Sequence, residues 1–360
     1  MDIRQATDHY EEWLRKQLTI IETDLKHKHK AMAKDAFSFL RATFYRWMQC
    51  WPQVCAGENE ATHVLAIGDV HVENFGTWRD AEGRLIWGVN DFDEAYELPY
   101  TLDLTRLAAS AHIAIRASKL SIHAGDACRA ILEGYTSAIQ TGGRPFVLEE
   151  DHLWLRNIVT GELRDPVHFW QRFDALATLR GHIPGSARKS VERLLPGPAR
   201  TYRWVHRIAG LGSLGRQRFA AVVVHEGGKM AREVKALAPS ACVWAAGGGS
   251  GRILYKPLLR QPVRAEDPFL QVKGKWIVRR LSPHCCRVEL ATLPKLRDER
   301  QLLYSMGFEV GNIHLGTRGA QTRILRDLKK RGAGWLHEAA GNMLQQSTRD
   351  WKEWRGSTKA

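Results

Sequence analysis

A glycine-rich segment between two strand-like stretches restricts the fold more than any other feature. Gly210, Gly212 and Gly215 have the spacing G-x-G-x-x-G, and Ser213 lies within the loop that they form. In a dinucleotide-binding fold such a loop opens a helix. Residues 218–237 instead predict two strands around a Gly-Gly turn, because valines and other strand-favouring residues fill the first of them. The pattern argues against a dinucleotide-binding fold and predicts a β-hairpin after the glycine loop.

The whole chain predicts an α+β protein with two lobes. Its 360 residues are enough for two domains or two lobes. Residues 1–200 predict a helical lobe and residues 201–281 a small β-rich lobe. Residues 282–360 predict a helical segment with a basic tail, which completes the helical lobe.

Residue patterns also give boundaries for individual elements. Residues 8–50 predict a helical run that ends at Pro52 and Gly57, and residues 101–118 predict a second helix with one apolar face. Strands are predicted at residues 64–67, 75–78, 85–89, 202–209, 218–224, 230–237, 252–259 and 275–281.

The net charge of +14 is unevenly distributed along the chain. Residues 188–360 hold 33 Lys and Arg against 13 Asp and Glu, whereas residues 1–187 hold 20 and 26. One part can therefore supply metal-binding carboxylates and the other phosphate-binding cations. The alternative is nonspecific attraction of the basic part to nucleic acid.

The first residues are polar and no long apolar run occurs, so the sequence predicts neither a secretory signal nor a membrane partner. The six cysteines form no C-x-x-C pair, and the histidines show no common ligand spacing. We therefore expect a cytoplasmic protein without a metal finger or a disulfide framework.

Two polar segments border the predicted hairpin of residues 75–89. Asp69 and Asn74 have the spacing D-x-x-x-x-N, in which the carboxylate orients an acceptor hydroxyl and the amide binds Mg²⁺. Asp91 follows Asn74 by 17 residues, so one tight hairpin can bring both to the same ion, with Asp93 as a further ligand. A simple turn held by local backbone hydrogen bonds is the alternative for the first segment.

Lys235 lies on the second strand after the glycine loop. Its neighbours are Val234 and Ala236, so it can point from an inner strand at nucleotide phosphates. The alternative is an edge lysine that discourages strand pairing between molecules.

Other polar residues have simpler expected roles. Asp103 is expected to cap a helix, with a buried acid that fixes the Asp69 loop as the alternative. His71 is expected to order the loop by hydrogen bonding, and Glu94 to be a solvated or salt-bridged surface carboxylate.

With these residues assembled, the chain resembles a bacterial family of unknown function with G-D-x-H-x-x-N-F-G and N-D-F-D-E motifs. That family is grouped with the protein-kinase-like and aminoglycoside-phosphotransferase-like superfamily. The matching segments are residues 37–41, which include Arg41, and residues 68–76, 90–94, 102–110, 210–215 and 233–236.

The resemblance implies a two-lobed kinase-like fold and roles for single residues. Asp69 would be the catalytic aspartate, Asn74 and Asp91 the magnesium ligands, and Lys235 the lysine that holds phosphate. Ile67 stands where the phosphotransferases commonly carry histidine. The glycine loop and the lysine follow the carboxylates instead of preceding them, which implies a circular permutation. The resemblance also implies a glutamate that pairs with Lys235, and the candidates are Glu233, Glu289 and Glu299.

The expected activity is ATP- and Mg²⁺-dependent transfer of phosphate to a hydroxyl of a small molecule or a protein. One alternative is nucleotidyl transfer, with adenylate attached to the target by the same fold. Another is a catalytically silent, kinase-shaped module that binds nucleic acid through its basic surface.

Overall fold

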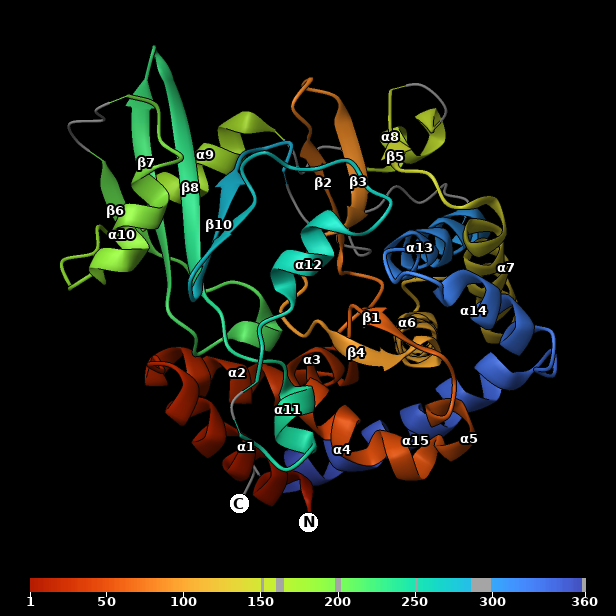
Figure 1. Cartoon of the computed structure of the whole chain (residues 1–360). Coiled ribbons are helices and arrows are strands. Elements are labelled where there is room, and N and C mark those ends of the chain that lie inside the picture. Colours follow the sequence, from red (N-terminus) through yellow and green to blue (C-terminus); the bar gives the residue numbers. More distant parts are fainter. Residues whose placement is uncertain (150–151, 160–164, 198–201, 250, 286–298, 358–360) are drawn as a thin grey trace.

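The computed structural model describes residues 1–149, 152–159, 165–197, 202–249, 251–285 and 299–357. Within these ranges the protein is a mixed α+β structure of helices and antiparallel sheets (Figure 1). No helix in these ranges combines the length and the apolar character needed to cross a membrane.

The N-terminal region forms several helices instead of one run. They are α1 (Ile3–Gln17), α2 (Glu22–Lys34), α3 (Ala36–Ala42), α4 (Phe44–Val54) and α5 (Ala56–Asn59). Asp35 breaks the predicted run, because its backbone is extended and its side chain caps α3 at the N–H of Ser38. The expected stop at Pro52 is wrong, since Pro52 lies inside α4, where it removes a single backbone hydrogen bond.

Two small antiparallel sheets hold the polar loops. Strand β1 (His63–Ala66) pairs with β4 (Tyr96–Pro99), and β2 (Phe75–Arg79) pairs with β3 (Leu85–Val89), which also pairs with β5 (Phe146–Val147). The β2–β3 hairpin confirms the sequence prediction. Because Phe75 lies opposite Val89, the residues just outside the hairpin meet, and Asn90 N–H donates to the carbonyl of Asn74 at 2.9 Å.

The helical body surrounds α6 (Tyr100–Arg116), which is buried from Tyr100 to Ala114 and confirms the helix expected at residues 101–118. Around it lie α7 (Ala124–Thr141), α13 (Glu299–His314), α14 (Ala320–Leu328) and α15 (Trp335–Ser357), shown at the right and base of Figure 1. A continuous apolar core joins these helices to the N-terminal ones.

Helices α7 and α13 pack so closely that glycines are required at their contact. A Cβ on Gly307 would overlap the backbone of Ile131, and a Cβ on Gly134 would overlap the backbone of Tyr304. We expect Gly307→Ala to lower the free energy of unfolding by about 2–3 kcal/mol, since overpacking forces the helices apart. Urea unfolding of this variant and of the control Gly341→Ala, which has open space around it, measures the effect. A loss no larger than in the control would contradict the close packing.

The larger sheet is antiparallel, with the order β6-β7-β8-β10-β9. Its strands are β6 (Arg203–His206), β7 (Arg218–His225), β8 (Gly228–Ala236), β10 (Trp276–Leu281) and β9 (Gln271–Lys273). Apolar side chains alternate between its faces, and α9 (Pro166–Asp174) packs on one face while α10 (Gly185–Glu192) packs on the other. A further helix, α8 (Leu153–Val159), precedes them along the chain.

One predicted strand is wrong. Residues 252–259 form no strand, and α12 (Tyr255–Arg260) occupies most of that stretch, after α11 (Ala241–Ala245). Pro257 explains the difference, because proline cannot donate to a strand ladder but is tolerated in the first turn of a helix.

Candidate active site

The loop between β1 and β2 is anchored by a buried carboxylate. Asp103, in the first turn of α6, accepts hydrogen bonds from the backbone N–H of Ile67 (2.7 Å) and of Gly68 (2.9 Å). His314 Nε2 lies 3.0 Å from Oδ2, the oxygen that accepts from Ile67. The N-cap of α6 is Pro99 and Asp103 does not cap this helix, so the cap interpretation is wrong and the alternative, a buried acid that fixes the loop, is correct. These three partners hold the backbone that presents Asp69.

The loop is also ordered from within. His71 Nδ1 accepts a hydrogen bond from the N–H of Glu73 (3.2 Å), and the carbonyl of His71 accepts one from the N–H of Asn74 (2.7 Å). Arg41 donates to the Glu73 carboxylate at 2.8 Å. The structural role expected for His71 is confirmed, and Arg41 ties α3 to the same loop.

Asp69 is held at one oxygen and faces the cavity with the other. Arg106 Nε donates to its Oδ1 at 2.8 Å. Arg106 is fully buried, and its guanidinium lies 5.0 Å from the ring of Phe44 and 4.8 Å from that of Trp47. Oδ2 accepts no hydrogen bond from the described residues, and a Cβ on Gly212 would lie 3.4 Å from it. The carboxylate therefore has a fixed orientation with one acceptor available.

Asn74 presents an unpaired oxygen to the same cavity. Its Nδ2 donates to the carbonyls of Asp69 (3.2 Å) and Asp91 (3.0 Å), which determines the orientation of the amide. Its Oδ1 is buried and has no hydrogen-bond partner within the described ranges. Amide and carboxylate oxygens are the ligands that hard divalent cations take. Asn74 and Asp91 therefore fit Mg²⁺.

Lys235 contacts the loop between β3 and β4, although 144 residues separate it from Asp91 in the sequence. Its Nζ lies 3.1 Å from Asp91 Oδ2 and also contacts the carboxylate of Asp93. Burial alone would raise the pKa of Asp91, but the charges of Lys235 and Arg279 outweigh it and hold that pKa below its usual range. Burial and the charge of Asp91 raise the pKa of Asp93. The pKa values of the two carboxyl groups therefore move apart, and that of Asp91 is the lower one.

A second ion pair joins the glycine loop to the same segment. Arg216, directly after Gly215, lies 3.1 Å from Glu94 Oε1 and 3.5 Å from Asp93 Oδ2. The other oxygen of Glu94 accepts the N–H of Ala241 at 2.7 Å. Glu94 is salt-bridged but buried, so its expected position at the surface is wrong.

The glycine loop, residues 210–215, borders the same cavity as the carboxylates of Asp69 and Asp91. Gly210 and Gly215 have φ angles of 72° and 95°, a region that favours glycine. At Gly212 a Cβ would lie 3.0 Å from the carbonyl oxygen of Arg41, which is closer than most such contacts, so a larger residue would require Arg41 to shift slightly. The loop and the carboxylates enclose a cavity of about 440 Å³, open solvent included. Seven residues that the sequence predicts for the site line it: Asp69, Asn74, Asp91, Asp93, Gly210, Gly212 and Ser213.

The remaining two predicted residues, Lys235 and Gly215, are not part of the cavity lining. Lys235 reaches it through its contacts with Asp91 and Asp93, which line it. Gly215 lies outside the lining, and its carbonyl accepts a hydrogen bond from the N–H of Ile21 at 2.7 Å. The structure thus brings together the groups that the sequence places in separate segments.

One family model matches the part of the chain that contains the two carboxylate loops, which are the β1–β2 loop with Asp69 and the β3–β4 loop with Asp91. The family is DUF2252. Its description is an uncharacterized protein conserved in bacteria, and the match covers residues 20–158. No curated protein and no solved structure matches the chain. The DUF2252 match includes Asp69, Asn74 and Asp91 but ends before the glycine loop and Lys235.

Sequence reasoning missed two arginines of the site. Arg106 lies within the DUF2252 match and within residues 102–110, one of the segments that carry the family resemblance. The sequence pattern around it does not predict that it pairs with Asp69. Arg216 lies beyond the DUF2252 match and follows the glycine loop directly. Its position directly after Gly215 is the sequence feature that could have indicated a role in the site.

None of the expected glutamates pairs with Lys235 in the described residues. Glu233 contacts Arg218 at 2.7 Å; burial opposes its ionisation, but neighbouring arginines lower its pKa to about 2. Glu299 accepts hydrogen bonds from the segment that precedes α7. Glu289 lies outside the described residues. In this structure Asp91 and Asp93 are the carboxylate partners of Lys235.

Proposed function

We propose that this protein is an ATP- and Mg²⁺-dependent phosphotransferase with a circularly permuted, two-lobed, kinase-like fold. The observation that carries the proposal is the contact between Lys235 and Asp91 beside the cavity under the glycine loop. In kinases a glycine-rich loop covers the phosphates, a lysine on the third strand holds them, and an aspartate and an asparagine bind the metal. Here the glycine loop joins β6 to β7, and Lys235 lies on β8, the third strand of the sheet.

The packing of the chain ends is consistent with the permutation. Arg46 donates to the carbonyl of Met1 at 3.1 Å and to the carboxylate of Asp350 at 3.0 Å. The two ends of the described chain therefore lie near each other, as a permuted chain requires. The helical lobe then contains segments from before and after the β-rich lobe.

Each polar group has a role in the proposed reaction. Asn74 Oδ1 and the Asp91 carboxylate hold Mg²⁺, which when bound neutralises charge on the phosphates of ATP. Asp69 orients the acceptor hydroxyl with Oδ2 and accepts its proton. The acceptor oxygen forms a bond to the terminal phosphorus, the bond from that phosphorus to the bridging oxygen breaks, and ADP leaves.

Lys235 has different partners in the free and the nucleotide-bound protein in this account. In this structure its buried ammonium is paired with the carboxyl groups of Asp91 and Asp93. Phosphate oxygens provide the same negative charge, so the lysine can bind them without being left unpaired. Arg216 stays bound to Glu94 and keeps the glycine loop attached to the metal-binding segment.

Calorimetry with ATP and Mg²⁺ tests the binding part of this proposal. Lys235→Met should weaken the affinity for Mg²⁺-ATP at least about tenfold, because a buried charge partner is removed. The matched control is Lys229→Met on the same strand, whose side chain is exposed and pairs with Asp174. Equal affinities in the two variants would remove Lys235 from the nucleotide site.

Mass spectrometry of candidate acceptors after incubation with ATP and Mg²⁺ tests the reaction. A gain of one phosphate is the expected product. A gain of adenylate would instead indicate nucleotidyl transfer. Salt-sensitive binding of DNA or RNA without any affinity for Mg²⁺-ATP would indicate a binding module without catalysis.

A further inference from the structure

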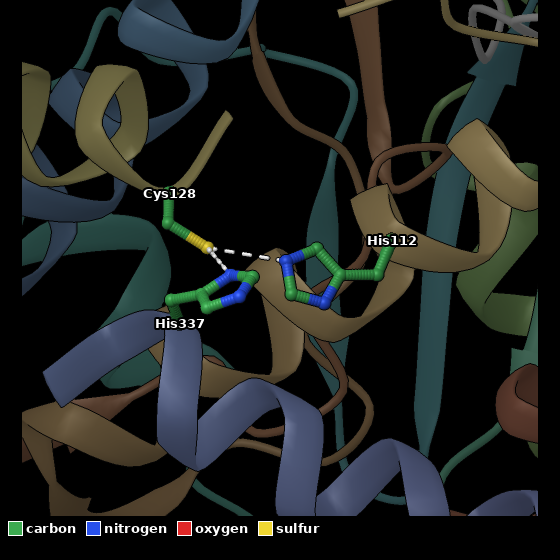
Figure 2. A group of neighbouring side chains, drawn as sticks. All are labelled: His112, Cys128 and His337. Atoms are coloured by element: carbon green, nitrogen blue, oxygen red, sulfur yellow. Dashed lines mark hydrogen bonds between the residues drawn. The ribbon is translucent and has the colours of Figure 1, made fainter. Parts of the chain in front are cut away.

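Two histidines and a cysteine from three helices converge outside the cavity lining described above. His112 is on α6, Cys128 on α7 and His337 on α15, and their side chains point toward one another (Figure 2). Cys128 Sγ lies 3.2 Å from His112 Nε2 and 4.0 Å from His337 Nδ1. All three ligand atoms lie within 4.8 Å of one another.

These distances match those around a tetrahedral zinc ion. Zn–S bonds of about 2.3 Å and Zn–N bonds of about 2.0 Å place neighbouring ligand atoms about 3.5 Å apart. The two measured separations lie on either side of that value. Small side-chain movements would therefore be enough to bind an ion.

The orientation of the side chains supports a ligand role. The backbone of Ala124 also interacts with the His112 ring, and such a second contact fixes the ring of metal-binding histidines. His112 and Cys128 are buried, whereas His337 is exposed and leaves one side of the cluster open to solvent. The donor set of two imidazoles and one thiol suits a borderline-soft ion and differs from the oxygen ligands of the Mg²⁺ site.

We propose that His112, Cys128 and His337 bind one Zn²⁺, with a water molecule in the fourth position. The ion would link α15 to α6 and α7. Helix α6 carries Asp103 and Arg106, which hold the loop that contains Asp69. A bound ion would therefore connect α15 to the helix that positions the proposed catalytic loop. The proposal does not depend on phosphotransfer. It revises the expectation from sequence spacing, because the ligands are 16 and 209 residues apart and no local motif joins them.

Titration of the metal-free full chain with Zn²⁺ in competition with a chromophoric chelator tests the proposal. The wild type should bind one Zn²⁺ tightly, and His337→Ala should weaken binding at least about a hundredfold. Because His337 is exposed, this variant should fold normally. The controls His63→Ala, which alters another exposed histidine, and Cys50→Ser, which alters another free cysteine, should leave the affinity unchanged.

Cobalt substitution identifies the ligands directly. Co²⁺ in the wild-type site should give the strong visible bands of a tetrahedral ion and a thiolate-to-cobalt absorption in the near ultraviolet. Cys128→Ser should remove the thiolate absorption, and Zn²⁺ should raise the melting temperature of the wild type but not of His337→Ala. The proposal is overturned if the wild type binds no Zn²⁺, or if His337→Ala binds it as tightly as the wild type does.

Discussion

Replacing Asp91 by asparagine is expected to lower Mg²⁺-dependent phosphate transfer from ATP at least about a thousandfold. The charges of Lys235 and Arg279 hold the pKa of Asp91 below its usual range against the effect of burial, so its carboxylate is ionised at neutral pH and can bind a cation. Asparagine keeps its size but removes its charge. Asp93 still pairs with Lys235 in this variant, so the buried ammonium keeps a partner.

The measurement is the initial rate of ADP formation at saturating acceptor, together with thermal unfolding of the same samples. Asp8→Asn is the control, because Asp8 is exposed on α1. Folded Asp91→Asn protein with a wild-type rate would show that Asp91 does not bind the catalytic metal.

Asp103→Ala is expected to lower the free energy of unfolding by about 3–5 kcal/mol. The Asp103 side chain is fully buried, and its loss leaves the N–H groups of Ile67 and Gly68 without their acceptor. It also leaves His314 without its buried carboxylate partner. Each of these groups then bears the cost of burial without a hydrogen bond.

Urea unfolding measures this loss, and Asp126→Ala is the matched control. Asp126 lies in the first turn of α7, as Asp103 does in α6, but its side chain is partly exposed. The control loses the interaction of a carboxylate with a helix N-terminus, which contributes about 0.3–1 kcal/mol. An equal loss in both variants would show that the loop contacts of Asp103 contribute nothing.

The sequence was sufficient for features that depend on local pattern. The β2–β3 hairpin follows from two short apolar runs around a turn, and its register places Asn74 beside Asn90. Strands β7 and β8 follow from the valine-rich run and the Gly-Gly turn. The spacing of these elements led to the expectation that Asp69, Asn74 and Asp91 would lie close together, which the structure shows.

Features that depend on distant contacts were not predictable from the sequence. Asp103 has the sequence context of a helix cap, and only the approach of the β1 loop makes it an acceptor for that loop. The guanidinium of Arg106 is buried because the rings of Phe44 and Trp47 cover it, and both belong to another helix. Cys128 and His337 meet only after α15 packs on the helical body.

The central claim is that the carboxylate loops and Lys235 form one site for a metal ion and a nucleotide. A crystal structure of the protein with Mn²⁺ and a non-hydrolysable ATP analogue tests it most directly, because anomalous scattering locates the ion. The account predicts one Mn²⁺ bound to Asn74 Oδ1 and Asp91, with phosphate oxygens at Lys235. Mn²⁺ and nucleotide located away from these three side chains would contradict it.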